Sequence, residues 1–279
     1  MANSVGNSLA LMKASMNVLK LDKELLVFPL MSGIASMLVV ASFVTPLVMS
    51  GAWEVFDESG AASYGAMAVM FGFYVVMYTV MFFFNAALVG AALIRLDGGD
   101  PTVSDGLAIA SKRMGSIIGY AVIAATVGMI LRMISERGGI FAKIASAIAG
   151  MAWTLTTYLT VPVLVTKDIG PIDAIKESAM IFKRTWGENV VGNAGLTWAM
   201  LFLYLGWTAS MFAIGWVAGM VAPVAIVGVV GVGIVGYIFL GLMGSALNGI
   251  YTAALYRFAM TGDTGTFDAN VVSNAFRAK

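Results

Sequence analysis

Six long apolar stretches constrain this chain more than any other feature of its sequence. The longest runs from Pro223 to Met260 and carries one charged residue, Arg257. A helix needs roughly 20 apolar residues to cross the ~30 Å hydrocarbon core of a bilayer. Because lipid offers no hydrogen bonds to an exposed backbone, helices are the structures expected there. The pattern therefore predicts an all-α membrane bundle with six transmembrane helices.

Composition agrees with this prediction. Hydrophobic residues make up 60% of the chain and charged residues 11%, against roughly 45–50% and about 25% in soluble domains. We expect the spans at residues 25–49, 64–94, 115–131, 140–165, 190–221 and 233–258. The last apolar run is too long for one upright helix at about 1.5 Å per residue. Residues 223–236 are therefore expected to be either re-entrant or part of a long kinked helix.

A short amphipathic segment, PIDAIKESAMIFKRTW (Pro171 to Trp186), precedes the fifth span. Its apolar residues share one stripe of a 3.6-residue helix: Ile172, Ile175, Ala179, Phe182 and Trp186. The charged residues lie off this stripe, which is typical of a helix in the headgroup plane with basic groups near anionic lipid. The alternative is a structural collar that orients the next span.

Related segments, Ser8 to Lys20 and Ser104 to Ser116, precede the first and third spans. With Ser15, Ser111 and Ser178 in register, a basic residue follows within five positions each time. These matches predict three repeats of one interfacial helix and two transmembrane helices. We expect a single membrane domain over residues 1–279, with repeats at approximately 4–100, 101–168 and 169–262 and a polar tail at 263–279.

Two of the expected repeats also end alike. The second span closes with AALIR (Ala91 to Arg95) and the sixth with AALYR (Ala253 to Arg257), and a Gly-Asp turn follows each. Six spans place 13 of the Lys and Arg residues on one side of the membrane and 3 on the other. The positive-inside rule then predicts a plasma (cytoplasmic) membrane protein with both termini and all three amphipathic helices in the cytoplasm.

Several classes of chemistry are disfavoured. The chain has no cysteine and no histidine, which removes disulfides, thiol nucleophiles and imidazole ligands, and its net charge of +1 gives no attraction to nucleic acid. GVGIVG (Gly231 to Gly236) lies inside an apolar run, so close helix approach is favoured over nucleotide binding. Asp97, Asp100 and Asp105 could bind a cation, but capping and a solvated turn are favoured. We expect no enzyme, no cofactor and no metal.

Two sets of residues are candidates for function. Polar residues within the spans predict either a cavity or hydrogen bonds between helices: Asn85, Asn248, Asn193, Thr157 and Tyr158. Residues of the amphipathic segments predict contact with lipid or a partner: Lys13, Lys20, Lys112, Arg113, Lys183, Arg184 and Trp186.

The segment DAIKESAMIFKRTWGENVVGN, with its echo LAIASKRMGSIIGYAVI, resembles an uncharacterised family of prokaryotic six-span membrane proteins. It is more distantly similar to the membrane domain beside some glycerophosphodiester phosphodiesterases. The chain lacks the soluble phosphodiesterase barrel, so the resemblance implies fold and membrane location and transfers no catalytic residue.

Three functions remain open from the sequence. The favoured one is a non-enzymatic scaffold or accessory subunit whose amphipathic helices contact membrane lipids, a protein partner or another copy of the chain. The alternative is a transporter or lipid-handling protein with a cavity between the repeats. A membrane enzyme would need clustered acids or a metal at the cytoplasmic face.

Overall fold

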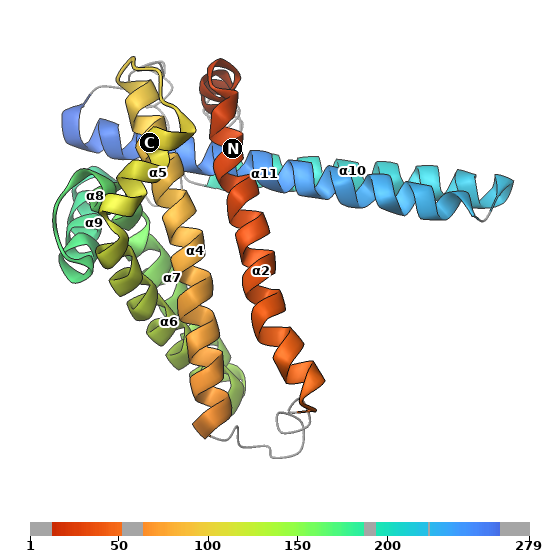
Figure 1. Cartoon of the computed structure of the whole chain (residues 1–279), viewed down its shortest axis with the longest axis horizontal. Coiled ribbons are helices and arrows are strands. Elements are labelled where there is room, and N and C mark those ends of the chain that lie inside the picture. Colours follow the sequence, from red (N-terminus) through yellow and green to blue (C-terminus); the bar gives the residue numbers. More distant parts are fainter. Residues whose placement is uncertain (1–12, 52–63, 187–193, 223, 263–279) are drawn as a thin grey trace. The chain divides into compact units, whose positions relative to one another are not determined.

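A computed structural model describes residues 13–51, 64–186, 194–222 and 224–262, and every regular element in these ranges is a helix (Figure 1). Six helices are long and apolar enough to cross a membrane: Lys23–Met49, Gly65–Leu96, Met114–Glu136, Gly139–Thr166, Met200–Met220 and Ala225–Thr261. The all-α architecture with six candidate spans is confirmed.

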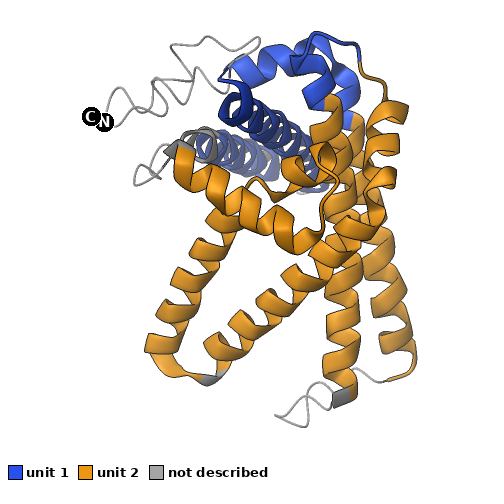
Figure 2. Ribbon diagram, turned by 90° about the vertical axis from the view of Figure 1, so that its left-hand side faces the viewer, with its two compact units in different colours: residues 1–26, 92–100, 186–279 blue, residues 27–91, 101–185 orange. Residues whose placement is uncertain are grey.

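The helices form two compact units (Figure 2). The first unit comprises residues 1–26, 92–100 and 186–279, and the second comprises residues 27–91 and 101–185.

The second unit contains most of the helices. These are α2 (Val27–Met49), most of α4 (Tyr64–Leu96), α5 (Val103–Lys112), α6 (Met114–Arg137), α7 (Gly139–Thr157), α8 (Thr160–Thr166) and nearly all of α9 (Pro171–Trp186). The expected amphipathic segment at 104–116 overlaps α5 and the start of α6, and the one at 171–186 coincides with α9.

Aromatic rings and small residues hold the second unit together. Phe43 of α2 meets Phe73 of α4 edge to face at 5.4 Å, and Phe82 of α4 stacks on Tyr120 of α6 at 4.4 Å between ring centroids. Gly106 of α5 lies so close to α2 and α4 that a Cβ there would stand 2.5 Å from Phe28. Only glycine allows α5 to pack at this depth.

The turn between α6 and α7 is shorter than the sequence indicated. The expected spans at 115–131 and 140–165 left residues 132–139 between them, but α6 continues to Arg137, and Gly138 alone separates it from α7. The ion pair between Arg132 and Glu136, one helical turn apart, favours the extra turn of helix. Gly139 has a φ of +43°, which other residues rarely adopt, so the chain reverses within a very short segment.

The first unit is built on a helical hairpin. Its helices α10 (Ala194–Val221) and α11 (Ala225–Thr261) lie side by side (Figure 1). The same unit holds a helical stretch at residues 13–21, the short helix η1 (Lys23–Leu26) and the end of α4.

The re-entrant alternative for residues 223–236 is wrong over the described part, because one unbroken helix runs from Ala225 to Thr261. Continuous helix satisfies every backbone group in an apolar stretch that has no proline after Pro223. At about 1.5 Å per residue α11 exceeds the ~30 Å hydrocarbon core, so it tilts or extends beyond that core.

GVGIVG serves close helix contact, as predicted. A Cβ at Gly236 would lie 2.0 Å from the indole ring of Trp207 on α10. The same indole donates its Nε1 hydrogen to the carbonyl of Gly233 at 3.2 Å. Trp207 therefore lies directly against the α11 backbone, and this contact joins the two helices of the hairpin.

Candidate functional site: helix α9 and the charged helix ends

Contacts around its first turn hold α9 against α6. Arg113 forms an ion pair with Asp168, and the Ser116 hydroxyl donates to the Ile169 carbonyl at 3.3 Å. A Cβ at Gly119 would lie 2.8 Å from the Pro171 ring. These contacts fix the residues just before α9. Pro171 is the first residue of the helix, where the missing N–H of a proline would have no partner within the helix in any case.

A second attachment lies at the break between α7 and α8. Pro162 has no N–H to continue the helical pattern, and the chain breaks at Tyr158 and Leu159. The fully buried Ser178 of α9 fills this break. Its hydroxyl accepts from the Leu159 N–H at 3.0 Å and donates to the Thr156 carbonyl at 2.7 Å.

The hydroxyl-rich stretch TLTTYLTVP (Thr154 to Pro162) offers threonine hydroxyls that could either satisfy the backbone carbonyl freed by Pro162 or bend the helix. Thr157 instead donates to the Trp153 carbonyl of its own helix at 2.9 Å, and Ser178 from a different helix fills the break. The partner was missed because residue spacing along one helix carries no information about a neighbouring helix.

Replacing Ser178 with alanine is expected to destabilise the protein by about 1–3 kcal/mol, because the buried Leu159 N–H then lacks its acceptor. Unfolding by titration with sodium dodecyl sulfate in mild detergent micelles measures this loss. Ser104→Ala, at an exposed position of α5, is the matched control and should change stability little. Equal stability of the two variants would show that the Ser178 hydroxyl does not support the break.

Two different faces of α9 carry its apolar residues. The buried face consists of Ala174, Ser178 and Ile181. The predicted stripe lies elsewhere: Ile172 is 59% exposed, and Ile175, Ala179 and Phe182 are half-buried. The core of the second unit therefore covers part of the apolar stripe and leaves Ile172 exposed.

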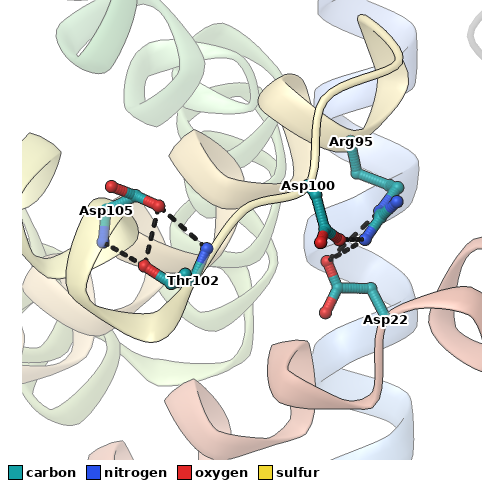
Figure 3. Close-up of polar contacts among 5 residues, drawn as sticks. All are labelled: Asp22, Arg95, Asp100, Thr102 and Asp105. Carbon is teal, nitrogen blue, oxygen red and sulfur yellow. Dashed lines mark hydrogen bonds and ion pairs between the residues drawn. The ribbon is translucent and has the colours of Figure 1, made fainter.

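The charged ends of helices form a second cluster, within the first unit (Figure 3). The Arg95 guanidinium donates from Nε and Nη2 to Oδ2 of Asp22 at 3.3 and 3.2 Å, and it also pairs with Asp100. The Asp22 side chain is only 5% exposed. Arg257 forms a further ion pair with Asp97 at 2.9 Å. The two arginines that close the similar sequences AALIR and AALYR thus both pair with carboxylates.

These contacts give the aspartate cluster a structural role. Asp97 and Asp100 pair with arginines, and Asp105 caps α5 together with Thr102. The predicted capping is confirmed. Asp22 was missed because its partner lies far away in the sequence, and the only signal was the presence of two acids, Asp22 and Glu24, just before the first span.

The pH should affect the start of α5. Hydrogen bonds from the Thr102 hydroxyl and then from the Thr102 backbone N–H lower the pKa of Asp105. Because the folded-state pKa is lowered, the charged carboxylate stabilises the helix start at pH values above the ordinary aspartate pKa. This stabilisation is lost as the pH falls through the lower, folded-state pKa. Amide exchange of the first turn of α5, corrected for intrinsic pH dependence, should lose protection on acidification. Asp105→Asn should remove that pH dependence, and an unchanged profile would contradict the assignment.

The predicted polar candidates do not form one site. Asn85 and Asn248 are exposed and belong to different units, and Asn193 lies outside the described residues. Thr157 is buried and Tyr158 is half-buried at the α7–α8 break. The structure brings only the last two residues together.

The basic candidates are mostly exposed: Lys13, Lys20, Lys112, Lys183 and Arg184. Arg113 differs, since it is half-buried and paired with Asp168. Trp186 ends α9, but its side chain lies outside the described part of the structure. Within the described residues, no group of three Asp or Glu side chains is arranged to hold a metal ion.

Comparison with known proteins gives one match. No curated protein and no solved structure matches the chain. Residues 64–267, which include the described parts of α4 through α11, match a family described as "Family of unknown function (DUF6159)". Because this match covers most of the sequence, the chain belongs to the DUF6159 family.

Proposed function

We propose that this protein is a non-enzymatic scaffold or accessory subunit of the plasma membrane, with cytoplasmic termini and amphipathic helices that contact lipid or a protein partner. The observation that carries the proposal is how α9 is held in the unit and which of its residues are exposed. Contacts at Pro171 and Ser178 hold this helix in place, while Ile172 of its apolar stripe is 59% exposed and Ile175, Ala179 and Phe182 are half-buried. A firmly held helix whose apolar stripe is partly exposed is suited to binding another surface.

The ion pairs support a structural rather than a catalytic use of the charges. Arg95 and Asp22, Arg257 and Asp97, and Lys167 and Glu177 join separate segments of the chain. Groups committed to such pairs are poor candidates for nucleophile and base, which must be free to meet a substrate.

The three-repeat organisation is also part of the proposal. Ser15, Ala110 and Ser178 are each fully buried in an amphipathic segment. The second repeat is then better aligned through Ala110 than through Ser111, which is exposed. The helix ends support the relation too, since left-handed glycines, Gly98 at +86° and Gly262 at +72°, follow AALIR and AALYR. The prokaryotic source and the likeness to phosphodiesterase membrane domains remain predictions.

Purification from native membranes in a mild detergent, after chemical cross-linking, tests the scaffold function. A constant partner or a defined homo-oligomer is expected in stoichiometric amount. A strictly monomeric protein without a partner would contradict the proposal.

The α7–α8 break favours a second candidate function, transport or lipid handling. Transporters often place binding sites at interrupted transmembrane helices. Here the buried side chain of Tyr120 lies against Thr157 and Thr160, which flank the break. If this region opens to water during transport, a Thr160→Cys variant should react with a membrane-impermeant thiol reagent. A complete lack of reaction in native membranes would contradict this candidate.

A further inference from the structure

We infer that α9 is the chain's binding surface for anionic phospholipid headgroups, and that Lys176 and Lys183 are the two side chains that recognise the anionic group. This inference rests on the proposed function and specifies the partner of its exposed helix as the membrane surface.

Helix geometry separates the apolar stripe of α9 from its buried face. At 3.6 residues per turn, the centre of the apolar stripe lies about 110° around the helix from the buried face of Ala174, Ser178 and Ile181. The helix can therefore keep its protein contacts while the stripe faces a different surface. A helix with only one apolar face could not do both.

The charges are distributed unevenly around the stripe. Lys176 and Lys183 occupy positions within about 20–40° of Ile172, at one edge of the stripe, whereas Asp173, Glu177 and Arg184 lie about 140–180° from its centre. Lys176 also pairs with Asp173 at 3.2 Å, but both side chains are exposed, so this pair is weak and Lys176 can bind another anion. Both lysines are exposed. Cations beside an apolar stripe, with acids on the far side, match a surface that is apolar below and anionic at the headgroups. This charge order selects lipid over an apolar protein surface.

The position of α9 in the chain also keeps it near a bilayer. It begins at Pro171, five residues after the candidate span that ends at Thr166. Five extended residues reach at most about 17 Å. The start of α9 therefore cannot move far from the membrane boundary.

Helix α5 lacks this surface, although it belongs to a related segment. Its Ile109 packs on Gly90, where a Cβ would lie 2.9 Å away, and its Gly106 lies against Phe28. Ile109 is thus packed inside the unit, whereas Ile172 of α9 is 59% exposed, so the lipid contact is assigned to α9 and not to α5.

The test uses the natural absence of cysteine. A bimane label on an Ile172→Cys variant, in bilayers of phosphatidylcholine with phosphatidylglycerol, should be quenched more by brominated phosphatidylglycerol than by brominated phosphatidylcholine at equal mole fraction. Aqueous iodide should quench it weakly and should quench a label on Asp173→Cys strongly. Equal iodide quenching at both positions would overturn the inference, and so would a label at 172 that neither brominated lipid nor iodide reaches.

The lysines are tested in the same bilayers. The excess quenching by brominated phosphatidylglycerol should fall in the Lys176→Gln/Lys183→Gln double variant. Loss of each lysine is expected to lower the local preference for phosphatidylglycerol on the order of fivefold. Lys112→Gln on α5 should leave it unchanged. An unchanged excess in the double variant would overturn the assignment of the lysines.

The two proposals fail separately. A co-purifying partner together with a stripe that neither quencher reaches would leave the scaffold function in place and remove the lipid inference. A lipid-facing stripe on a strictly monomeric protein would support the lipid inference and contradict the scaffold function.

Discussion

Replacing Arg95 with alanine is expected to destabilise the protein by about 3–5 kcal/mol, the usual loss when one member of a buried ion pair is removed. Asp22 is 5% exposed and accepts two hydrogen bonds from Arg95. Without the guanidinium its carboxylate stays buried and uncompensated. Because whole proteins are stable by only about 5–15 kcal/mol, a large fraction of the molecules should unfold early in a detergent titration.

Two comparisons separate this effect from a general loss of charge. Glu136→Gln removes an exposed ion pair within α6 and should cost only about 0.3–0.5 kcal/mol. The Arg95→Met/Asp22→Asn double variant leaves no unpaired charge at this pair, so it should be less destabilised than the sum of the single changes. Additive losses, or an Arg95→Ala variant as stable as Glu136→Gln, would show that the ion pair contributes little.

The Gly236→Val variant is expected to lose about 2–4 kcal/mol. A Cβ at this position would meet the Trp207 ring at 2.0 Å, and overpacking costs roughly 1–3 kcal/mol. The displaced indole would also lose its hydrogen bond to the Gly233 carbonyl, worth about 0.5–1.5 kcal/mol. The same detergent titration measures the change, and a red shift of tryptophan emission would report that the ring has moved toward water.

The glycine motif supplies its own control. Gly231 has open space around its Cβ position, so Gly231→Ala should be neutral or slightly stabilising through better helix propensity. Replacing the indole ring with a smaller side chain in a Trp207→Leu/Gly236→Val double variant should recover part of the lost stability. If Gly231→Ala and Gly236→Val were equally destabilising, the motif would act through helix flexibility rather than through contact with Trp207.

The sequence predicted the features that depend on local pattern. Apolar length located the six candidate spans, and amphipathic periodicity located α9 from Pro171 to Trp186. These predictions succeed because lipid forces long apolar segments into helices. The capping of α5 by Asp105 is equally local, since Thr102 and Asp105 lie within one turn.

Features that depend on contacts between helices were not predictable in the same way. Ser178 was identified as a repeated position, but its bonds to Leu159 and Thr156 require the packing of α9 on the α7–α8 break. The pairing of Asp22 with Arg95 joins residues far apart in the chain. The burial of Ala110 in place of Ser111 likewise follows from how α5 packs.

Membrane topology remains the central prediction, and single-cysteine labelling in the naturally cysteine-free chain tests it most directly. Asn17→Cys, Ser111→Cys and Lys183→Cys are exposed positions in the three amphipathic segments, and Lys143→Cys lies near the start of α7. A membrane-impermeant maleimide applied to intact cells should label residue 143 and leave the other three unlabelled until the membrane is opened. Labelling of residue 17, 111 or 183 in intact cells would contradict the account.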